Sequence, residues 1–139
     1  MTILDTNVLS ELMKRSPNPD VVSWVNNQTP SSLFITSITQ AEILYGLELL
    51  PDGQRKDRLR KTAEEMFETD FSGRILPFDS NTAGIWANIV SGRKRSGLPI
   101  SHFDAQIAAI CRSYGAQLAT RNTGDFIHCG IKLINPWQK

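Results

Sequence analysis

Four acidic residues stand where a parallel α/β sheet would gather them at one edge: Asp5, Glu42, Asp104 and Asp125. Asp5 directly follows a short apolar run, and Asp125 lies five residues past Thr120, in the loop after a later run. Glu42 and Asp104 fall in the first turns of two expected helices. Ligands of parallel α/β sheets bind outside the carboxyl ends of the strands. The four carboxyl groups are therefore expected to lie close together.

Such a group of carboxylates has a defined chemistry. Carboxylates repel one another in a medium of low dielectric constant, and a divalent cation neutralises them. All-oxygen ligands suit the hard cation Mg²⁺, or Mn²⁺, and these metals typically serve phosphoryl chemistry. The polar neighbours Thr6, Asn7, Thr120 and Asn122 are expected to orient the carboxylates.

Each acid also has a purely structural interpretation. Glu42 completes a capping box that begins at Thr39. Asp104 and Asp125 suit the positive end of a helix dipole or a loop cap, and Asp5 suits an Asx turn at the start of a helix. Four independent caps have no reason to converge on one edge of a sheet, so together the acids favour a site.

The elements that must position these acids alternate along the chain. Apolar runs predict five strands, at residues 2–4, 33–36, 74–78, 117–120 and 131–134. Helical spacing predicts helices over residues 8–13, after 18–20, over 39–50 and 52–68, from a cap at Asp79 to Gly97, and over 101–114. This alternation is typical of an α/β fold with a central parallel sheet of about five strands and helices on both faces.

Composition limits the class of protein. The chain has 139 residues, 40% of them hydrophobic, which predicts one domain spanning residues 1–139. The formal net charge of +1 excludes nucleic-acid binding through bulk charge alone. Two cysteines, Cys111 and Cys129, are too few for a disulfide framework. Neither a signal peptide nor a membrane-spanning segment is predicted, so we expect a cytoplasmic protein.

Basic and apolar stretches suggest surfaces for partners. Residues 52–68 hold five basic and five acidic residues, which predicts either phosphate contacts or a solvated helical face. Arg93-Lys94-Arg95 is a second candidate for phosphate contacts, and Arg121 is the residue most expected to bind a substrate phosphate. The apolar side formed by Ile43, Leu47 and Leu50 suits either the core or a groove for a partner helix.

Four segments in this order resemble PIN-domain ribonucleases, and the match is to the VapC-type toxins of bacterial toxin–antitoxin pairs. The segments are residues 3–7, 37–46, 104–109 and 119–126, and the ending Ile134-Asn135-Pro136-Trp137 is similar as well. The resemblance implies a PIN-like fold and a Mg²⁺-dependent endoribonuclease that cleaves RNA until a cognate antitoxin inhibits it. It also implies a homodimer and a larger complex with a small DNA-binding antitoxin.

The resemblance also implies roles for individual residues. Asp5, Glu42 and Asp104 match the family's three acidic metal ligands. Family members place the fourth acid at the position of either Asn122 or Asp125, and here only Asp125 carries a charge. The implied reaction is in-line attack of a metal-activated water on the scissile phosphate.

Two other classes of protein remain open. A receiver-like or phosphoryl-transfer protein also carries acids at strand ends, but a phosphatase needs a second Asp two residues after the first, where this chain has Asn7. A receiver normally has a Lys on a late strand, and none ends the fourth strand. The other alternative is a non-catalytic binding module whose acids only cap helices.

Overall fold

The fold is built on a five-stranded parallel sheet with the strand order β3-β2-β1-β4-β5. The computed structural model describes residues 1–138. The strands are β1 (Thr2–Leu4), β2 (Leu33–Thr36), β3 (Ile75–Leu76), β4 (Gln117–Ala119) and β5 (Leu133–Ile134). Because every neighbouring pair is parallel, all carboxyl ends of the strands lie at one edge of the sheet.

Helices connect the strands and cover the sheet. They are α1 (Thr6–Leu12), α2 (Pro19–Asn26), α3 (Ser37–Glu48), α4 (Gln54–Glu65), α5 (Ser80–Arg95) and α6 (His102–Tyr114). Short helical turns at Pro30–Ser32 and Thr123–Phe126, and a π-helical turn at Met66–Asp70, complete the chain. Among residues 1–138, no helix has the length and apolar character needed to span a membrane.

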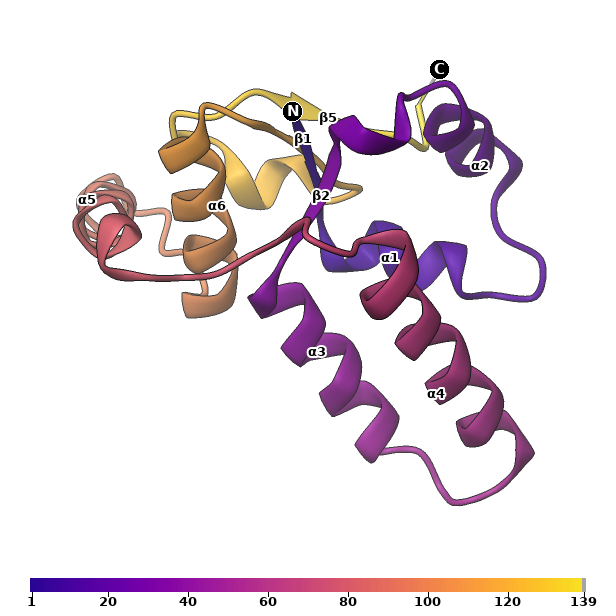
Figure 1. Cartoon of the computed structure of the whole chain (residues 1–139). Helices are drawn as coiled ribbons and strands as arrows, with labels where there is room; N and C mark the ends of the chain where they lie inside the picture. The colour runs from indigo at the N-terminus through magenta and orange to yellow at the C-terminus, as the bar shows by residue number, and fades with distance from the viewer. Residues whose placement is uncertain (139) are drawn as a thin grey trace.

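Two hydrophobic clusters lie on opposite faces of the sheet, as the alternation of side chains along β1 requires. Leu4 belongs to the cluster that packs under α1–α4, whereas Ile3 belongs to the cluster under α5 and α6. Figure 1 shows α5 and α6 on one side of the sheet and α1, α3 and α4 on the other. The predicted sheet with helices on both faces is therefore confirmed.

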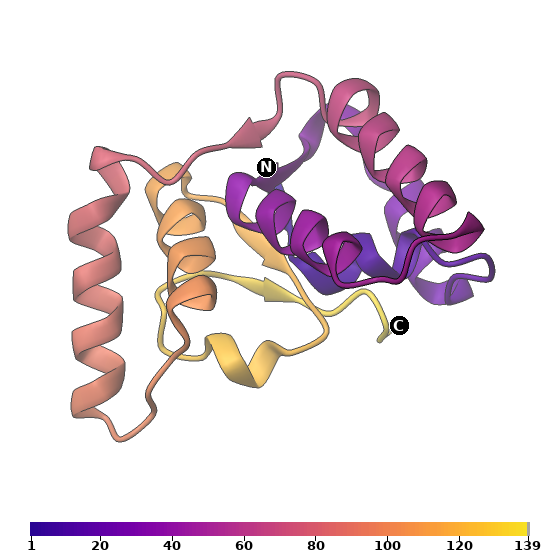
Figure 2. The same ribbon diagram turned by 90° about the horizontal axis from the view of Figure 1, so that it is seen from below.

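The helices α3 and α4 form an antiparallel pair that extends away from the sheet. Both views show them side by side, joined by the loop at Pro51-Asp52-Gly53 (Figures 1 and 2). Of the two, α3 packs against α1, which starts at the carboxyl edge of the sheet, and α4 packs against α3. This pair therefore extends the surface that surrounds the expected site.

Several element boundaries differ from the prediction, each for a local reason. The third strand is only two residues long, and Pro77, which cannot donate a backbone hydrogen bond, follows it. The fifth strand begins at Leu133 rather than at residue 131. The charged helix 52–68 ends at Glu65, where the chain widens into the π-helical turn. The cap at Asp79 is confirmed, since its carboxylate accepts from Asn81 N.

Candidate active site

Asp5 lies at the centre of the carboxyl edge, directly after the middle strand β1. Its Oδ1 accepts a hydrogen bond of 2.8 Å from Thr6 N, and its Oδ2 accepts one of 2.7 Å from Thr120 Oγ1. The residue is 5% exposed. Asp5 thus caps α1, as the structural interpretation expected, and the same carboxylate also faces the pocket described below.

Glu42 reaches the same edge from the second turn of α3. The helix begins at Ser37 because Thr36 Oγ1 accepts from Thr39 N at 3.1 Å. The capping box predicted for Thr39 and Glu42 was therefore wrong, because the cap lies three residues earlier. Glu42 Oε1 instead accepts a 2.9 Å hydrogen bond from Thr6 Oγ1. The carboxylate is thereby directed across the sheet toward the start of α1.

Asp104 comes from the first turn of α6, as predicted. This helix begins at a Ser101 cap, whose Oγ accepts from Asp104 N at 3.2 Å. The end of α6 leads into the start of β4, so the first turn of α6 lies at the opposite, carboxyl edge of the sheet. The cap holds Asp104 in this first turn. Asp104 is half-buried there.

One pocket of about 440 Å³ joins these three acids. Asp5, Glu42 and Asp104 line it together with residues of α1 and of the loop after β4, among them Asn7, Arg121 and Asn122. Residues from five separated parts of the sequence therefore meet, and all but the last, Trp137, were brought here by the predicted topology. We call this space the carboxylate pocket.

Burial and mutual repulsion disfavour negative charge in the carboxylate pocket. Burial raises the pKa of Asp5 to about 6, and the charges of Asp104 and Glu42 add to this rise. Burial also raises the pKa of Glu42 and of Asp104, with further contributions from Asp104 and Asp125 respectively. Among residues 1–138, none of the three pocket acids forms an ion pair with Lys or Arg. Such a site favours an added cation.

The polar neighbours predicted to orient the acids do so for Asp5. Asn7 Nδ2 lies 3.4 Å from Asp5 Oδ2 and 3.3 Å from Thr120 Oγ1, and Asn122 N donates to Thr120 Oγ1 at 3.1 Å. Asn7 Oδ1 also accepts from Arg121 N at 3.3 Å. Asn7 therefore positions the acid at its own strand and the loop after β4, a role different from that of a second catalytic acid.

Arg121 lies at the rim of the carboxylate pocket, where a substrate phosphate was expected. Its guanidinium lies 5.3 Å from the centre of the Trp137 ring, and both residues line the pocket. This cation–π contact holds the guanidinium while leaving it charged. The C-terminal segment thus contributes Trp137 to the pocket. This gives a structural role to the ending Ile134-Asn135-Pro136-Trp137, which resembles the family's.

Asp125 lies apart from the other acids. It is exposed on the turn Thr123–Phe126 and does not line the carboxylate pocket, whereas Asn122 does. Its charge nevertheless raises the pKa of Asp104. The assignment of Asp125 as a fourth ligand stays a prediction.

Arg93 holds the turn that carries Asp125. Its Nη1 donates to the carbonyl oxygens of Asp125 (2.9 Å) and Ile127 (3.0 Å), and its Nε donates to the carbonyl of Leu98. The side chain is only 5% exposed. The interpretation of Arg93 as a phosphate contact was therefore wrong, because its donors are used inside the protein; its neighbour Lys94 is exposed.

The donor set suits a hard divalent cation, although the side chains are not closed around one. Asp5, Glu42 and Asp104 supply oxygen ligands of the kind that Mg²⁺ prefers. Burial raises the pKa of all three, so their negative charge is disfavoured without a cation. Within residues 1–138, no group of three His, Cys, Asp or Glu side chains is arranged to hold a metal ion as it stands. Ligation therefore requires the three carboxylates to draw together.

Part of the pocket wall, on α1 and just after it, was not predicted from the sequence. Ser10, Glu11 and Lys14 line the carboxylate pocket there. Glu11 accepts from Lys14 Nζ at 3.0 Å and from Asn18 N at 3.1 Å, so its negative charge is already compensated. The spacing from Asn7 to these residues is that of one helical face, and this signal would have found them.

The stability of the metal-free protein should depend on pH through Asp5. Its pKa of about 6 in the folded state exceeds the ordinary value of 3.8, so the folded state binds this proton more tightly than the unfolded state does. The protonated Asp5 therefore adds roughly 3 kcal/mol to the free energy of unfolding below about pH 4. This contribution is lost as the pH rises through 6. The difference in unfolding free energy between wild type and Asp5→Asn, measured in EDTA from pH 4 to 7.5, should change accordingly. Parallel curves would contradict the burial of the charge.

Comparisons with known proteins agree with this geometry. The family model described as PIN domain matches residues 2–130. The chain is similar to Toxin FitB of Neisseria gonorrhoeae (39% identity, 99% of each chain) and to VapC ribonuclease Y4jK of Sinorhizobium fredii (37% identity, 99% of each chain). A solved structure described as FitAB bound to an IR36 DNA fragment superimposes with a TM-score of 0.94 at 38% identity, covering 100% of this chain and 97% of that one.

Proposed function

The chain belongs to the PIN domain family, and from this premise we propose that it is a metal-dependent endoribonuclease acting as the toxin of a toxin–antitoxin pair. The observation that carries the proposal is the meeting of three carboxylates, none of them in an ion pair within residues 1–138, in one pocket with Arg121 at its rim. Two similar proteins, Toxin FitB and VapC ribonuclease Y4jK, support it by their names.

Asp5, Glu42 and Asp104 would hold Mg²⁺, or Mn²⁺, and Asp125 is proposed as a fourth acid, with Asn122 as the alternative at the pocket wall. A bound cation of this kind supplies Lewis acidity toward a phosphodiester and makes water a better nucleophile. Thr6 and Thr120 keep the carboxylates of Glu42 and Asp5 in place through their hydroxyl hydrogen bonds.

The other residues of the pocket bind and orient the substrate. The guanidinium of Arg121, stacked on Trp137, meets a phosphate oxygen of the RNA and fixes the scissile phosphodiester over the acids. Asn7 keeps this loop in register with Asp5 through its bond to Arg121 N. No general-acid histidine is required in this scheme.

The proposal includes a partner. The FitAB structure, described as bound to DNA, supports a cognate DNA-binding antitoxin that inhibits this chain and forms a larger complex with it. We propose in addition a homodimer, action on RNA in the cytoplasm, and one catalytic domain over residues 1–139. The single domain is supported by the sheet, because the N-terminal strand β1 lies between β2 and β4, so that strands from both halves of the chain share one sheet.

Cleavage of RNA by the purified chain tests this function. The protein is first treated with EDTA and then incubated with total bacterial RNA in Mg²⁺, in Mn²⁺ or in EDTA alone. We expect discrete fragments with either metal, none in EDTA, and inhibition by the protein encoded beside this chain. Absence of cleavage under all conditions, or labelling of Asp5 by a small acyl phosphate, would instead favour the phosphoryl-transfer alternative.

A further inference from the structure

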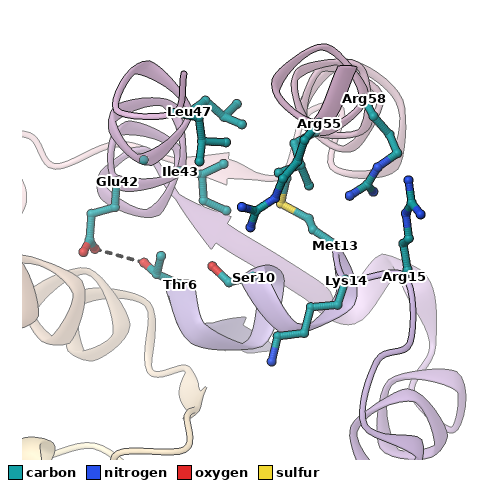
Figure 3. A pocket seen from close by; sticks show the side chains of 13 residues that line it. Thr6, Ser10, Met13, Lys14, Arg15, Glu42, Ile43, Leu47, Arg55 and Arg58 are labelled. Carbon is teal, nitrogen blue, oxygen red and sulfur yellow. Dashed lines mark hydrogen bonds between the residues drawn. The ribbon is translucent and has the colours of Figure 1, made fainter. Parts of the chain in front are cut away.

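A second pocket, of about 410 Å³, opens beside the carboxylate pocket, between α1, α3 and α4 (Figure 3). We call it the basic pocket. One face of each helix lines it, and the positions repeat at helical spacing: Arg55, Arg58 and Leu59 come from α4, while Ile43 and Leu47 come from α3. This is the apolar side of residues 39–50 that sequence alone left open between core and groove.

The walls of the basic pocket combine two chemistries. Its floor is apolar, formed by Met13, Ile43, Leu47, Leu50 and Leu59. Its rim is basic: Figure 3 shows Arg55 and Arg58 projecting from α4 and Arg15 pointing toward them from the segment that follows α1. An apolar floor under a ring of cations suits a ligand that has a flat apolar part and an anionic part.

The rim cations have no partner within residues 1–138. The guanidinium groups of Arg15, Arg55 and Arg58 make neither a hydrogen bond nor an ion pair there, and Arg58 Nε is buried without an acceptor. On the same helix, by contrast, Arg60 pairs with Glu48. Arg15 and Arg55 are exposed, whereas Arg58 is half-buried. A buried donor without an acceptor costs free energy, and the orphaned Arg58 Nε beside two further cations indicates that an anion supplies the missing acceptor.

The basic pocket is continuous with the carboxylate pocket. Thr6, Ser10, Lys14 and Glu42 line both. A polymer whose phosphodiester lies over Asp5 and Glu42 therefore has a path past Lys14 into the basic pocket. RNA offers both required parts in every nucleotide, a phosphate and a planar base.

We propose that the basic pocket is a nucleotide subsite, which binds the residue of single-stranded RNA next to the cleaved phosphodiester. The phosphate of this nucleotide contacts Arg55 and Arg58, and its base packs against the apolar floor. The inference rests on the proposed function. A peptide segment is a less suitable occupant, because the rim is cationic, and it appears below as an outcome of the test.

Gly46 offers a way to block the basic pocket without disturbing the fold. It lines the pocket within α3, and a Cβ built there meets no atom within 4 Å. The Cβ of Gly46→Leu therefore has room at the pocket wall, the rest of the side chain extends from it, and leucine favours the helix more than glycine does. The melting temperature of Gly46→Leu should not fall below that of the wild type.

The experiment measures binding of a fluorescein-labelled, random-sequence single-stranded RNA 12-mer by anisotropy in EDTA, where no cleavage is expected. The double variant R55Q/R58Q should bind at least tenfold more weakly. The slope of log K against log salt concentration should become smaller in magnitude by about 0.7 for each phosphate contact that is lost. Gly46→Leu should bind at least fivefold more weakly with an unchanged salt slope, because it blocks the base and not the charges. Lys61→Gln, an exposed cation of α4 outside the pocket, is the matched control and should bind as the wild type does.

The outcomes separate this inference from the proposed function. If the wild type cleaves RNA with Mg²⁺ and the variants bind the 12-mer as tightly as it does, the subsite is overturned. The same holds if the variants keep their RNA affinity but lose affinity for the antitoxin, since the pocket then holds protein. If the wild type cleaves no RNA, the proposed function itself fails.

Discussion

Replacing Asp5 or Asp104 with asparagine should abolish RNA cleavage while leaving the fold intact. Each change removes one of the three charges that would hold the divalent cation, and we expect the rate to fall by at least about 10³-fold. Circular dichroism should be unchanged. The measurement is the initial rate of RNA cleavage at saturating Mg²⁺ for the wild type and both variants.

The loss of cleavage in Asp5→Asn should be accompanied by a gain in thermal stability. Burial and neighbouring acids oppose the charge of Asp5 in the metal-free state, so Asp5→Asn should unfold at a higher temperature than the wild type at pH 7.5 in EDTA. Asp57→Asn, an exposed acid in the first turn of α4, is the matched control and should keep full activity. Full activity of both pocket variants would defeat the assignment of these carboxylates.

Replacing Arg93 with methionine should be the most destabilising single change discussed for this protein. It would leave the carbonyl groups of Leu98, Asp125 and Ile127 without their common donor, and a buried side chain would lose the three hydrogen bonds made by its charged group. We expect a loss of about 2–4 kcal/mol in the free energy of unfolding, because hydrogen bonds to a charged group are lost while water reaches the freed carbonyls, and the melting temperature should fall by roughly 5–15 °C. Calorimetry of the metal-free protein measures it.

The same change should also lower activity, because the turn that carries Asp125 and ends the loop of Arg121 loses its anchor. Arg93→Lys keeps the charge but not the forked donors, so its stability should fall between that of Arg93→Met and the wild type. Lys94→Met, at the exposed neighbouring position, is the control and should lose less than about 0.5 kcal/mol. Equal stability of Arg93→Met and Lys94→Met would contradict the anchoring role.

The strands and helices that bring the three acids together were predictable from the sequence, because each of them has a local signal and they alternate along the chain. A short apolar run that stops at Asp5 and the helical spacing around Asp104 are local signals, and parallel pairing then brings both to one edge. The carboxylates of Asp5, Glu42 and Asp104 do line one pocket.

Interactions between distant residues were not predictable in this way. Arg93 appeared as one of three surface cations, and only the packing of α5 against α6 and the turn beyond β4 shows that it is buried. Glu42 completed a capping pattern with Thr39, yet its partner is Thr6, 36 residues away in the chain. A local pattern cannot reveal which of two hydrogen bonds the tertiary structure selects.

Calorimetric titration of Mn²⁺ into EDTA-treated, dialysed protein tests the central claim most directly, because it asks whether the three carboxylates form one metal site. We expect the wild type to bind Mn²⁺, Asp104→Asn and Asp5→Asn to bind it at least tenfold more weakly, and Asp57→Asn to bind it as the wild type does. Equal Mn²⁺ affinity in the wild type and in Asp104→Asn, or no binding by the wild type at millimolar Mn²⁺, would contradict it.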